Sequence, residues 1–192
     1  MCRYAMTAYK PHYACFHCRK TFKRRLLGDV IEGWSKEENE TPAKCPECSN
    51  LMADMGMDFE SPKKNNVKAW EHISLLYTVG VTFHSCGCSG PGYIPSNADD
   101  LIQHFVKIKK TYLKHQQFWA RRISDPTTQS EIAKDKHQNG KFLYATPKSL
   151  KKGTKNTPIY DASEAQKYWN DKVLVIENKI RKVTDTKALK SK

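Results

Sequence analysis

The sequence predicts a small α+β fold, in which short strands near the N-terminus precede a helical region and a basic, extended C-terminal tail that ends in a helix. Three observations support this order. Two Cys-x-x-Cys pairs lie within the first 50 residues, an apolar stripe of helical period crosses the middle of the chain, and the last third combines many lysines with few apolar residues. We therefore divide the chain into three segments, 1–60, 61–125 and 126–192.

The composition limits how much of the chain can fold on itself. A length of 192 residues favours one domain with extensions, or two small domains. Hydrophobic residues make up 39% and the mean hydropathy is −0.73, below the usual share for a globular protein. Part of the chain is therefore expected to pack on a partner or to stay mobile.

The charge indicates the kind of partner. The chain has 33 Lys and Arg against 20 Asp and Glu, a net charge of +13. Such a surplus favours polyanions, with nucleic acid as the first candidate and an anionic membrane surface as the second. No run of 18 apolar residues and no apolar leader segment are present, so we expect a cytoplasmic protein without a membrane span.

Four cysteines of segment 1–60 have the spacing of two zinc knuckles: Cys15, Cys18, Cys45 and Cys48. A Cys-x-x-Cys turn supplies two thiolates from one tight loop, and two such turns complete a tetrahedral shell. Because protein sulfurs would fill all four positions, we expect one structural Zn²⁺ ion and no open position for a substrate. An odd total of seven cysteines also favours metal over disulfides.

A second group of potential ligands is His84, Cys86 and Cys88, in a loop rich in glycine and proline. Its spacing is not that of a knuckle, and three interpretations stay open. The residues are small side chains buried in a tight loop, or they bind a second zinc ion with a ligand from elsewhere, or they form a catalytic Cys–His pair. The sequence does not fix the roles of Cys2, Cys86 and Cys88.

Apolar periodicity places the regular elements. Residues 67–79 have helical spacing with Gly80 as a C-cap, and residues 81–85 alternate as in a short strand. A long basic amphipathic helix carries the stripe 101–119, and a last helix is predicted from about 163 to 183. We expect the helix–glycine-loop–helix region of segment 61–125 to pack on the zinc module.

Segment 126–192 contains 15 basic and seven acidic residues. From Pro126 to Pro158 apolar residues are sparse, apart from Phe142-Leu143-Tyr144. We therefore expect this stretch to be extended and without a core of its own. Whether residues 126–160 are ordered in the absence of a partner stays open.

The basic residues expected to contact RNA lie between the knuckles, on the central helix and in the tail. They are Arg19, Lys20, Lys23, Arg24, Arg25, Lys107, Lys109, Lys110, Lys114, Arg121, Arg122, Lys148, Lys151, Lys152 and Lys155. Scattered cations suit folded RNA, which proteins recognise by shape and backbone more than by base edges.

Residues 12–50 resemble the zinc ribbons of ribosomal proteins and of the transcription machinery, which serve many functions. The stretch from Cys2 to Phe22 is also similar to a group of basic zinc-ribbon proteins of the Bacteroidota. This resemblance implies a lineage-specific ribosomal protein of the large subunit. It also implies rRNA binding, with the four cysteines as the only site that can be transferred. We expect a structural protein with neighbouring ribosomal proteins as further partners, monomeric within the assembly, with no enzymatic activity, no membrane and no small-molecule substrate.

Two other function classes stay open. A zinc-ribbon DNA-binding or transcription-associated factor would bind duplex DNA more tightly than structured RNA, although no recognition helix is evident. An enzyme using the loop from His84 to Cys88 would have a thiol of lowered pKa at Cys86 or Cys88. The sequence identifies neither the rRNA site nor whether the chain is a permanent subunit or a transient factor.

Overall fold

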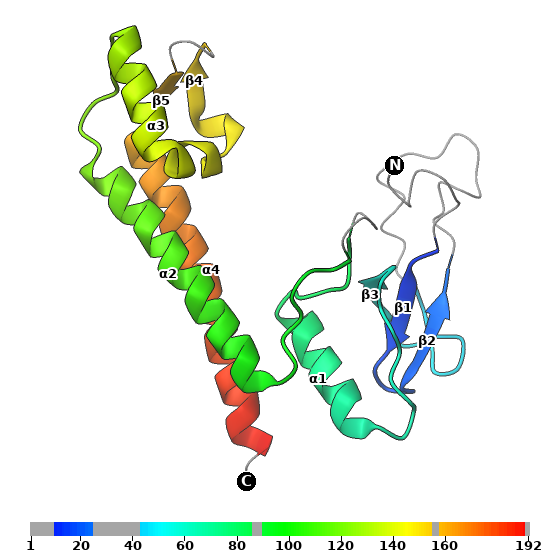
Figure 1. The fold of residues 1–192 in the computed structure, drawn as a ribbon. Helices are drawn as coiled ribbons and strands as arrows, with labels where there is room; N and C mark the ends of the chain where they lie inside the picture. The colour runs from blue at the N-terminus through cyan, green and yellow to red at the C-terminus, as the bar shows by residue number, and fades with distance from the viewer. Residues whose placement is uncertain (1–9, 25–42, 86–89, 155–157, 191–192) are drawn as a thin grey trace, which may run out of the picture. The chain divides into compact units, whose positions relative to one another are not determined.

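The computed structural model describes residues 10–24, 43–85, 90–154 and 158–190. In this part of the chain it shows a small α+β fold with four α-helices and small antiparallel sheets (Figure 1). The chain forms two compact units, Met1–Ala98 and Asp99–Lys192. The division into three segments at residues 60 and 125 stays a prediction, and each unit is described by itself.

The first unit is built on a three-stranded antiparallel sheet. Its central strand is β1 (His12–Cys15), which lies between β2 (Lys20–Lys23) and β3 (Ala53–Gly56). A register shift between His12 and Tyr13 interrupts the pairing with β3. Each strand has only four residues, so backbone pairing alone gives this sheet little stability.

Helix α1 (Val67–Thr78) confirms the helix predicted over residues 67–79. It ends as expected at Gly80, which has a φ of +74°. The amide of Gly80 donates to the carbonyl of Tyr77 at 2.9 Å, and the amide of Val81 donates to the carbonyl of Leu76 at 2.8 Å. This pair of bonds is a Schellman motif, which satisfies the last carbonyls of the helix.

Helix α1 packs on the sheet of the first unit. The buried side chains of this core are Ala14, Ala53, Met55, Phe59, Trp70 and Ile73. Two of them, Trp70 and Ile73, come from α1, so the helix packs against the sheet. In the part of the chain that the structure describes, this core is small, with six buried side chains.

The strand predicted over residues 81–85 is wrong. The segment runs beside β3, and the amide of Phe83 donates to the carbonyl of Met55 at 2.9 Å, but no ladder follows. Gly56 explains this approach, because a Cβ there would lie 2.7 Å from the backbone nitrogen of His84. Gly56 also has a φ of +86°, so both space and backbone conformation require glycine here.

In the second unit, α2 (Ala98–Arg121) and α4 (Ala162–Lys190) are antiparallel neighbours (Figure 1). Side-chain contacts link them at Asp99–Lys187 (2.6 Å), Lys109–Glu177 (2.8 Å) and Gln116–Asn170 (2.5 Å). The two residue numbers of each pair have the same sum, as antiparallel pairing without a slip requires. The predicted helix over 101–119 is confirmed, and the apolar side chains of its C-terminal half pack within this unit.

The prediction that residues 126–158 are extended is wrong. Most of this stretch forms α3 (Gln129–Ala145), which begins at a capping box between Thr128 and Glu131. Its few apolar side chains suffice because they join a shared core. Leu143 is buried together with side chains of α2 and α4.

After α3, a 3₁₀ turn η4 (Lys148–Leu150) leads into a hairpin of β4 (Lys151–Gly153) and β5 (Pro158–Tyr160). Helix α4 follows at once and confirms the last predicted helix, with an end seven residues beyond 183. Its first turn is capped by Asp161, whose Oδ1 accepts the amide of Glu164 at 3.1 Å.

Arg122 joins the elements of the second unit. Its guanidinium donates to Asp125 at 2.9 Å and to Asp135 at 2.8 Å, and its side chain is only 8% exposed. It also lies over the rings of Trp119 and Tyr160, each with a centroid 5.5 Å away. The end of α2, helix α3 and strand β5 are therefore held by one cation.

We expect Arg122→Ala to lower the free energy of unfolding by about 3 kcal/mol, because it leaves two largely buried carboxylates without their cation. The matched control is Arg121→Ala, an exposed neighbour, which should change it by less than about 0.5 kcal/mol. Urea denaturation followed by circular dichroism measures both. Equal losses in the two variants would contradict the account of Arg122.

Because of the ion pair between Arg122 and Asp135, we expect the protein to lose stability in acid. Burial raises the pKa of Asp135, but hydrogen bonds from Arg122 and Asn139 outweigh burial and hold that pKa below its ordinary value of 3.8. The stabilisation is therefore complete above that ordinary pKa and is lost as the pH falls through the folded-state value. Unfolding measured against pH should show this acid limb in the wild type and a flatter one in Asp135→Asn.

Candidate metal centre and basic surfaces

The first knuckle is the turn between β1 and β2. Cys15 ends β1 and is buried, and the amide of Cys18 donates to its Sγ at 3.4 Å. Arg19, the next residue, has a φ of +51°. The antiparallel pairing of Cys15 with Lys20 closes the turn.

The second knuckle repeats this arrangement. The amide of Cys45 donates to the carbonyl of Asn50, and the amide of Ser49 donates to the carbonyl of Cys45, each at 2.8 Å. Ser49 directly follows Cys48 and has a φ of +58°. Among the described residues, Arg19 and Ser49 are the non-glycine residues with positive φ, so both knuckles use the same unfavourable backbone conformation at the same position.

The two knuckles bring their four sulfurs together. The Sγ atoms of Cys15 and Cys48 are 3.6 Å apart, those of Cys18 and Cys45 are 4.0 Å apart, and all four lie within 4.8 Å of one another. A tetrahedral ion with metal–sulfur bonds of about 2.3 Å separates its ligands by about 3.8 Å. The sulfur–sulfur distances are near this value and far longer than a disulfide bond, so the four cysteines can hold a metal ion.

Burial and neighbouring groups shift the pKa of Cys15, Cys18 and Cys45. Hydrogen bonding with Cys48 and then burial raise the pKa of Cys18, and burial raises that of Cys15. Burial acts in the same direction on Cys45, but backbone amides of Cys48 and Glu47 lower its pKa to about 7. Four thiolates this close need a cation between them, so metal binding releases protons and weakens as the pH falls.

Of the basic residues predicted between the knuckles, two are held by the protein itself. Lys20 forms an ion pair with Glu47, which joins the first knuckle to the second. The Nε of Arg19 donates to the carbonyl of Lys64 at 3.1 Å. Lys23 is exposed, and Arg25 lies outside the described residues.

On α2 the predicted residues separate into two sets. Four exposed cations follow one another along a single helix face at steps of three, four and seven positions: Lys107, Lys110, Lys114 and Arg121. We call these four the basic stripe. Lys109 lies on another face, where it pairs with Glu177, and the charge of Arg122 is balanced inside the unit.

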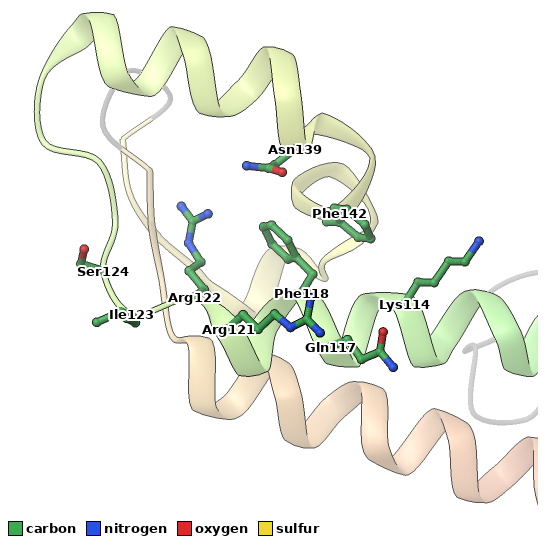
Figure 2. Close-up of a pocket in the computed structure, with 9 residues that line it drawn as sticks. All are labelled: Lys114, Gln117, Phe118, Arg121, Arg122, Ile123, Ser124, Asn139 and Phe142. Atoms are coloured by element: carbon green, nitrogen blue, oxygen red, sulfur yellow. The ribbon is translucent and has the colours of Figure 1, made fainter.

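The C-terminal end of the basic stripe borders a cavity of about 530 Å³. Figure 2 shows its lining, with Lys114 and Arg121 on α2 and the rings of Phe118 and Phe142 between α2 and α3. The two rings are stacked with their centroids 4.5 Å apart. The residues that line this cavity include no carboxylate.

A second cavity, of about 540 Å³, gathers the predicted residues Lys148, Lys151 and Lys152. We call it the lysine pocket. It is lined by Lys136, Gly140, Leu143, Tyr144, Lys148, Lys151, Lys152, Gly153, Thr154, Pro158 and Tyr160. Sequence reasoning missed it because it joins α3 to the hairpin, although the apolar residues at 142–144 were a visible signal. Lys155 lies outside the described residues.

The second cysteine group is described only at His84. Its Nε2 lies 3.5 Å from Oδ1 of Asp54, a carboxylate that the sequence did not place near it. Cys2, Cys86 and Cys88 lie outside the described residues, so the interpretations as a second zinc site or a catalytic pair stay predictions. None of the helices described is long and apolar enough to cross a membrane.

Ser49→Gly should raise the free energy of unfolding by about 0.5–1 kcal/mol, because glycine relieves the positive φ of the second knuckle. The control is Ser163→Gly in the first turn of α4, which should lower it by about 0.5 kcal/mol. Thermal unfolding of metal-loaded protein distinguishes the two signs. A loss of stability in Ser49→Gly would show that the knuckle does not have this conformation.

A strong chelator should unfold the first unit and leave the second folded, because the metal ligands lie in a unit with a small core. Hydrogen exchange read by mass spectrometry would show lost protection at Cys45 and Met52 and unchanged protection in α2 and α4. Protection that survives metal removal throughout the chain would contradict a structural role for the ion.

No protein-family model, no curated protein and no solved structure matches the chain. What the geometry shows is a four-cysteine site that can hold a metal ion, in a small α+β protein with two basic surfaces.

Proposed function

We propose that this protein is a structural, zinc-stabilised RNA-binding protein, a component of the large ribosomal subunit that catalyses no reaction. The observation that carries the proposal is the basic stripe on α2, where exposed cations repeat along one face of a helix that buries Phe105, His115 and Trp119 on another. The proposed partners are rRNA and neighbouring ribosomal proteins in the cytoplasm.

Zinc is the metal that the cysteine site suits best. Four thiolates in a closed tetrahedral shell are typical of structural Zn²⁺, and soft sulfur ligands exclude Mg²⁺ and Ca²⁺. A single iron ion is another metal that such a shell accepts, and it would colour the protein. With no position open to water or substrate, the ion would act on folding and not on chemistry.

The basic stripe fits a phosphate backbone. From Lys107 to Arg121 it extends about 21 Å at 1.5 Å per residue. The second unit has 21 basic and ten acidic residues, so it carries +11 of the net charge of +13. Several of its carboxylates, such as Asp125 and Asp135, already pair inside the unit. The outward charge is therefore strongly positive, which favours RNA recognised through its backbone.

The ribosomal setting is supported by composition. Low hydropathy, two small units and a charge surplus in one of them suit a chain that completes its packing on a large polyanion. The similarity of the N-terminal stretch to basic zinc-ribbon proteins points to the same setting.

The test is a sucrose gradient of cell lysate that contains the tagged full-length protein, run at low and at high salt. We expect the protein to sediment with the large ribosomal subunit and to stay bound at moderate salt. Release at modest salt would indicate a transient factor and contradict a permanent component. Protein that stays at the top of the gradient at both salt concentrations would overturn the ribosomal proposal.

A charge-matched pair of variants shows whether the basic stripe is responsible. Replacing Lys107, Lys110 and Lys114 by glutamine should weaken binding and lower the slope of log K against log salt by about two to three. Replacing the exposed Lys63, Lys64 and Lys68 of the first unit removes the same charge and should have little effect. Binding to duplex DNA that is tighter than binding to structured RNA would favour a DNA-binding factor instead.

A further inference from the structure

The lysine pocket lies on a part of the second unit that the basic stripe does not reach. It is enclosed by the C-terminal half of α3, by η4 and by the β4–β5 hairpin, and it shares no lining residue with the cavity beside Arg121. Its volume of about 540 Å³ falls in the range typical of small-ligand sites. The pocket therefore needs its own explanation.

Four lysines and no carboxylate line this pocket: Lys136, Lys148, Lys151 and Lys152. Two of them have weak contacts within the protein. The Nζ of Lys151 reaches the carbonyl of Tyr144 at 3.5 Å, and the Nζ of Lys152 lies 3.9 Å from Asp161 while its side chain is 68% exposed. Cations gathered around a concave, partly apolar space attract an anion strongly, because the walls exclude much of the screening water.

The pocket also presents an aromatic ring. Tyr144 is 81% exposed, and it stands at the end of α3 next to Leu143, which is buried in the core. Consecutive helix positions point in different directions, so one residue fixes the helix and the other offers its ring to solvent. Leu143 and Tyr160 give the pocket an apolar floor.

Gly140 supports a role for the open space. It lies inside α3, where glycine costs about 1 kcal/mol relative to alanine. The fold does not require it, since a Cβ there would meet only the ring of Tyr144, at an ordinary contact distance of 3.5 Å. A larger side chain would occupy part of the pocket, so glycine at this position leaves that space open to a ligand.

We propose that the lysine pocket binds one unstacked nucleotide of single-stranded RNA, with the base against Tyr144 and the flanking phosphates against the lysines. This inference rests on the proposed RNA-binding function and gives it a second mode. The ligand must combine a flat aromatic group with phosphate, because the pocket offers a ring and point charges side by side. Lysine contacts phosphate without reading base edges, so the pocket would tolerate different bases.

The experiment uses the full-length, metal-loaded protein and a fluorescein-labelled oligouridylate of about ten nucleotides, with binding followed by fluorescence anisotropy. Tyr144→Ala should weaken binding about tenfold, the expected loss of one stacked base. Lys151→Gln combined with Lys152→Gln should lower the salt slope by about 1.4. Lys134→Gln, on the same helix but outside the lining, is the charge control and should leave binding unchanged.

Gly140→Leu separates occupancy of the pocket from folding. Leucine favours the helix, so thermal unfolding should stay at or above the wild-type temperature while oligouridylate binding is lost. Gly140→Ala should keep both. Ultraviolet crosslinking of the bound oligouridylate should label the peptide that contains Tyr144.

The outcomes separate this inference from the proposed function. If every variant binds oligouridylate as the wild type does while the protein still binds rRNA, the pocket inference fails and the proposed function stands. If uridine triphosphate competes as strongly as the oligomer, the ligand is a free nucleotide and the RNA assignment is overturned. If the wild type binds neither oligouridylate nor rRNA, both fail.

Discussion

The main constraint visible in the described part of the first unit is a cluster of four sulfur atoms, which two turns hold within 4.8 Å of one another. The strands of this unit have four residues each, and among the described residues six buried side chains form the core between the sheet and α1, so backbone pairing and apolar packing there contribute limited stability. The unfavourable φ at Arg19 and Ser49 persists because the surroundings determine it. An ion bound by all four thiolates would offset that strain and close the loop of residues between the knuckles.

The second unit reaches stability in another way. Its core is aromatic and shared, so α2, α3 and α4 each bury a limited stripe, and Arg122 joins the end of α2 to helix α3 and strand β5 through two carboxylates and several rings. Asp125 and Asp135 are largely buried in ion pairs with Arg122, whereas the lysines of the basic stripe are exposed on the surface of the unit. The positive surface follows from the same distribution of residues that builds the core.

Sequence reasoning found the features that depend on local spacing. The paired cysteines, α1 with Gly80 at its end, and the stripe of α2 are all set by residues close together in the chain. It failed at α3, because a helix with few apolar residues is stabilised by a core that other segments supply. The capping box at Thr128 and Glu131 was visible and would have marked the start of that helix.

The basic residues show the same limit. Periodicity alone cannot separate Lys107, which faces solvent, from Lys109, which pairs with Glu177, because the difference lies in where α4 packs. The lysine pocket joins residues of α3 to a hairpin that begins after it, so no local pattern contains it. Which lysines pair with carboxylates and which line the pocket is decided by how the helices and the hairpin of the second unit pack together.

The most direct test of the account is the metal content and the metal ligands of the purified full-length protein. Elemental analysis with X-ray absorption should find one zinc ion per chain, bound by four sulfurs at about 2.3 Å. Replacing any one of Cys15, Cys18, Cys45 and Cys48 by serine should weaken its retention. A folded, metal-free chain, or zinc bound by ligands other than these cysteines, would contradict the account.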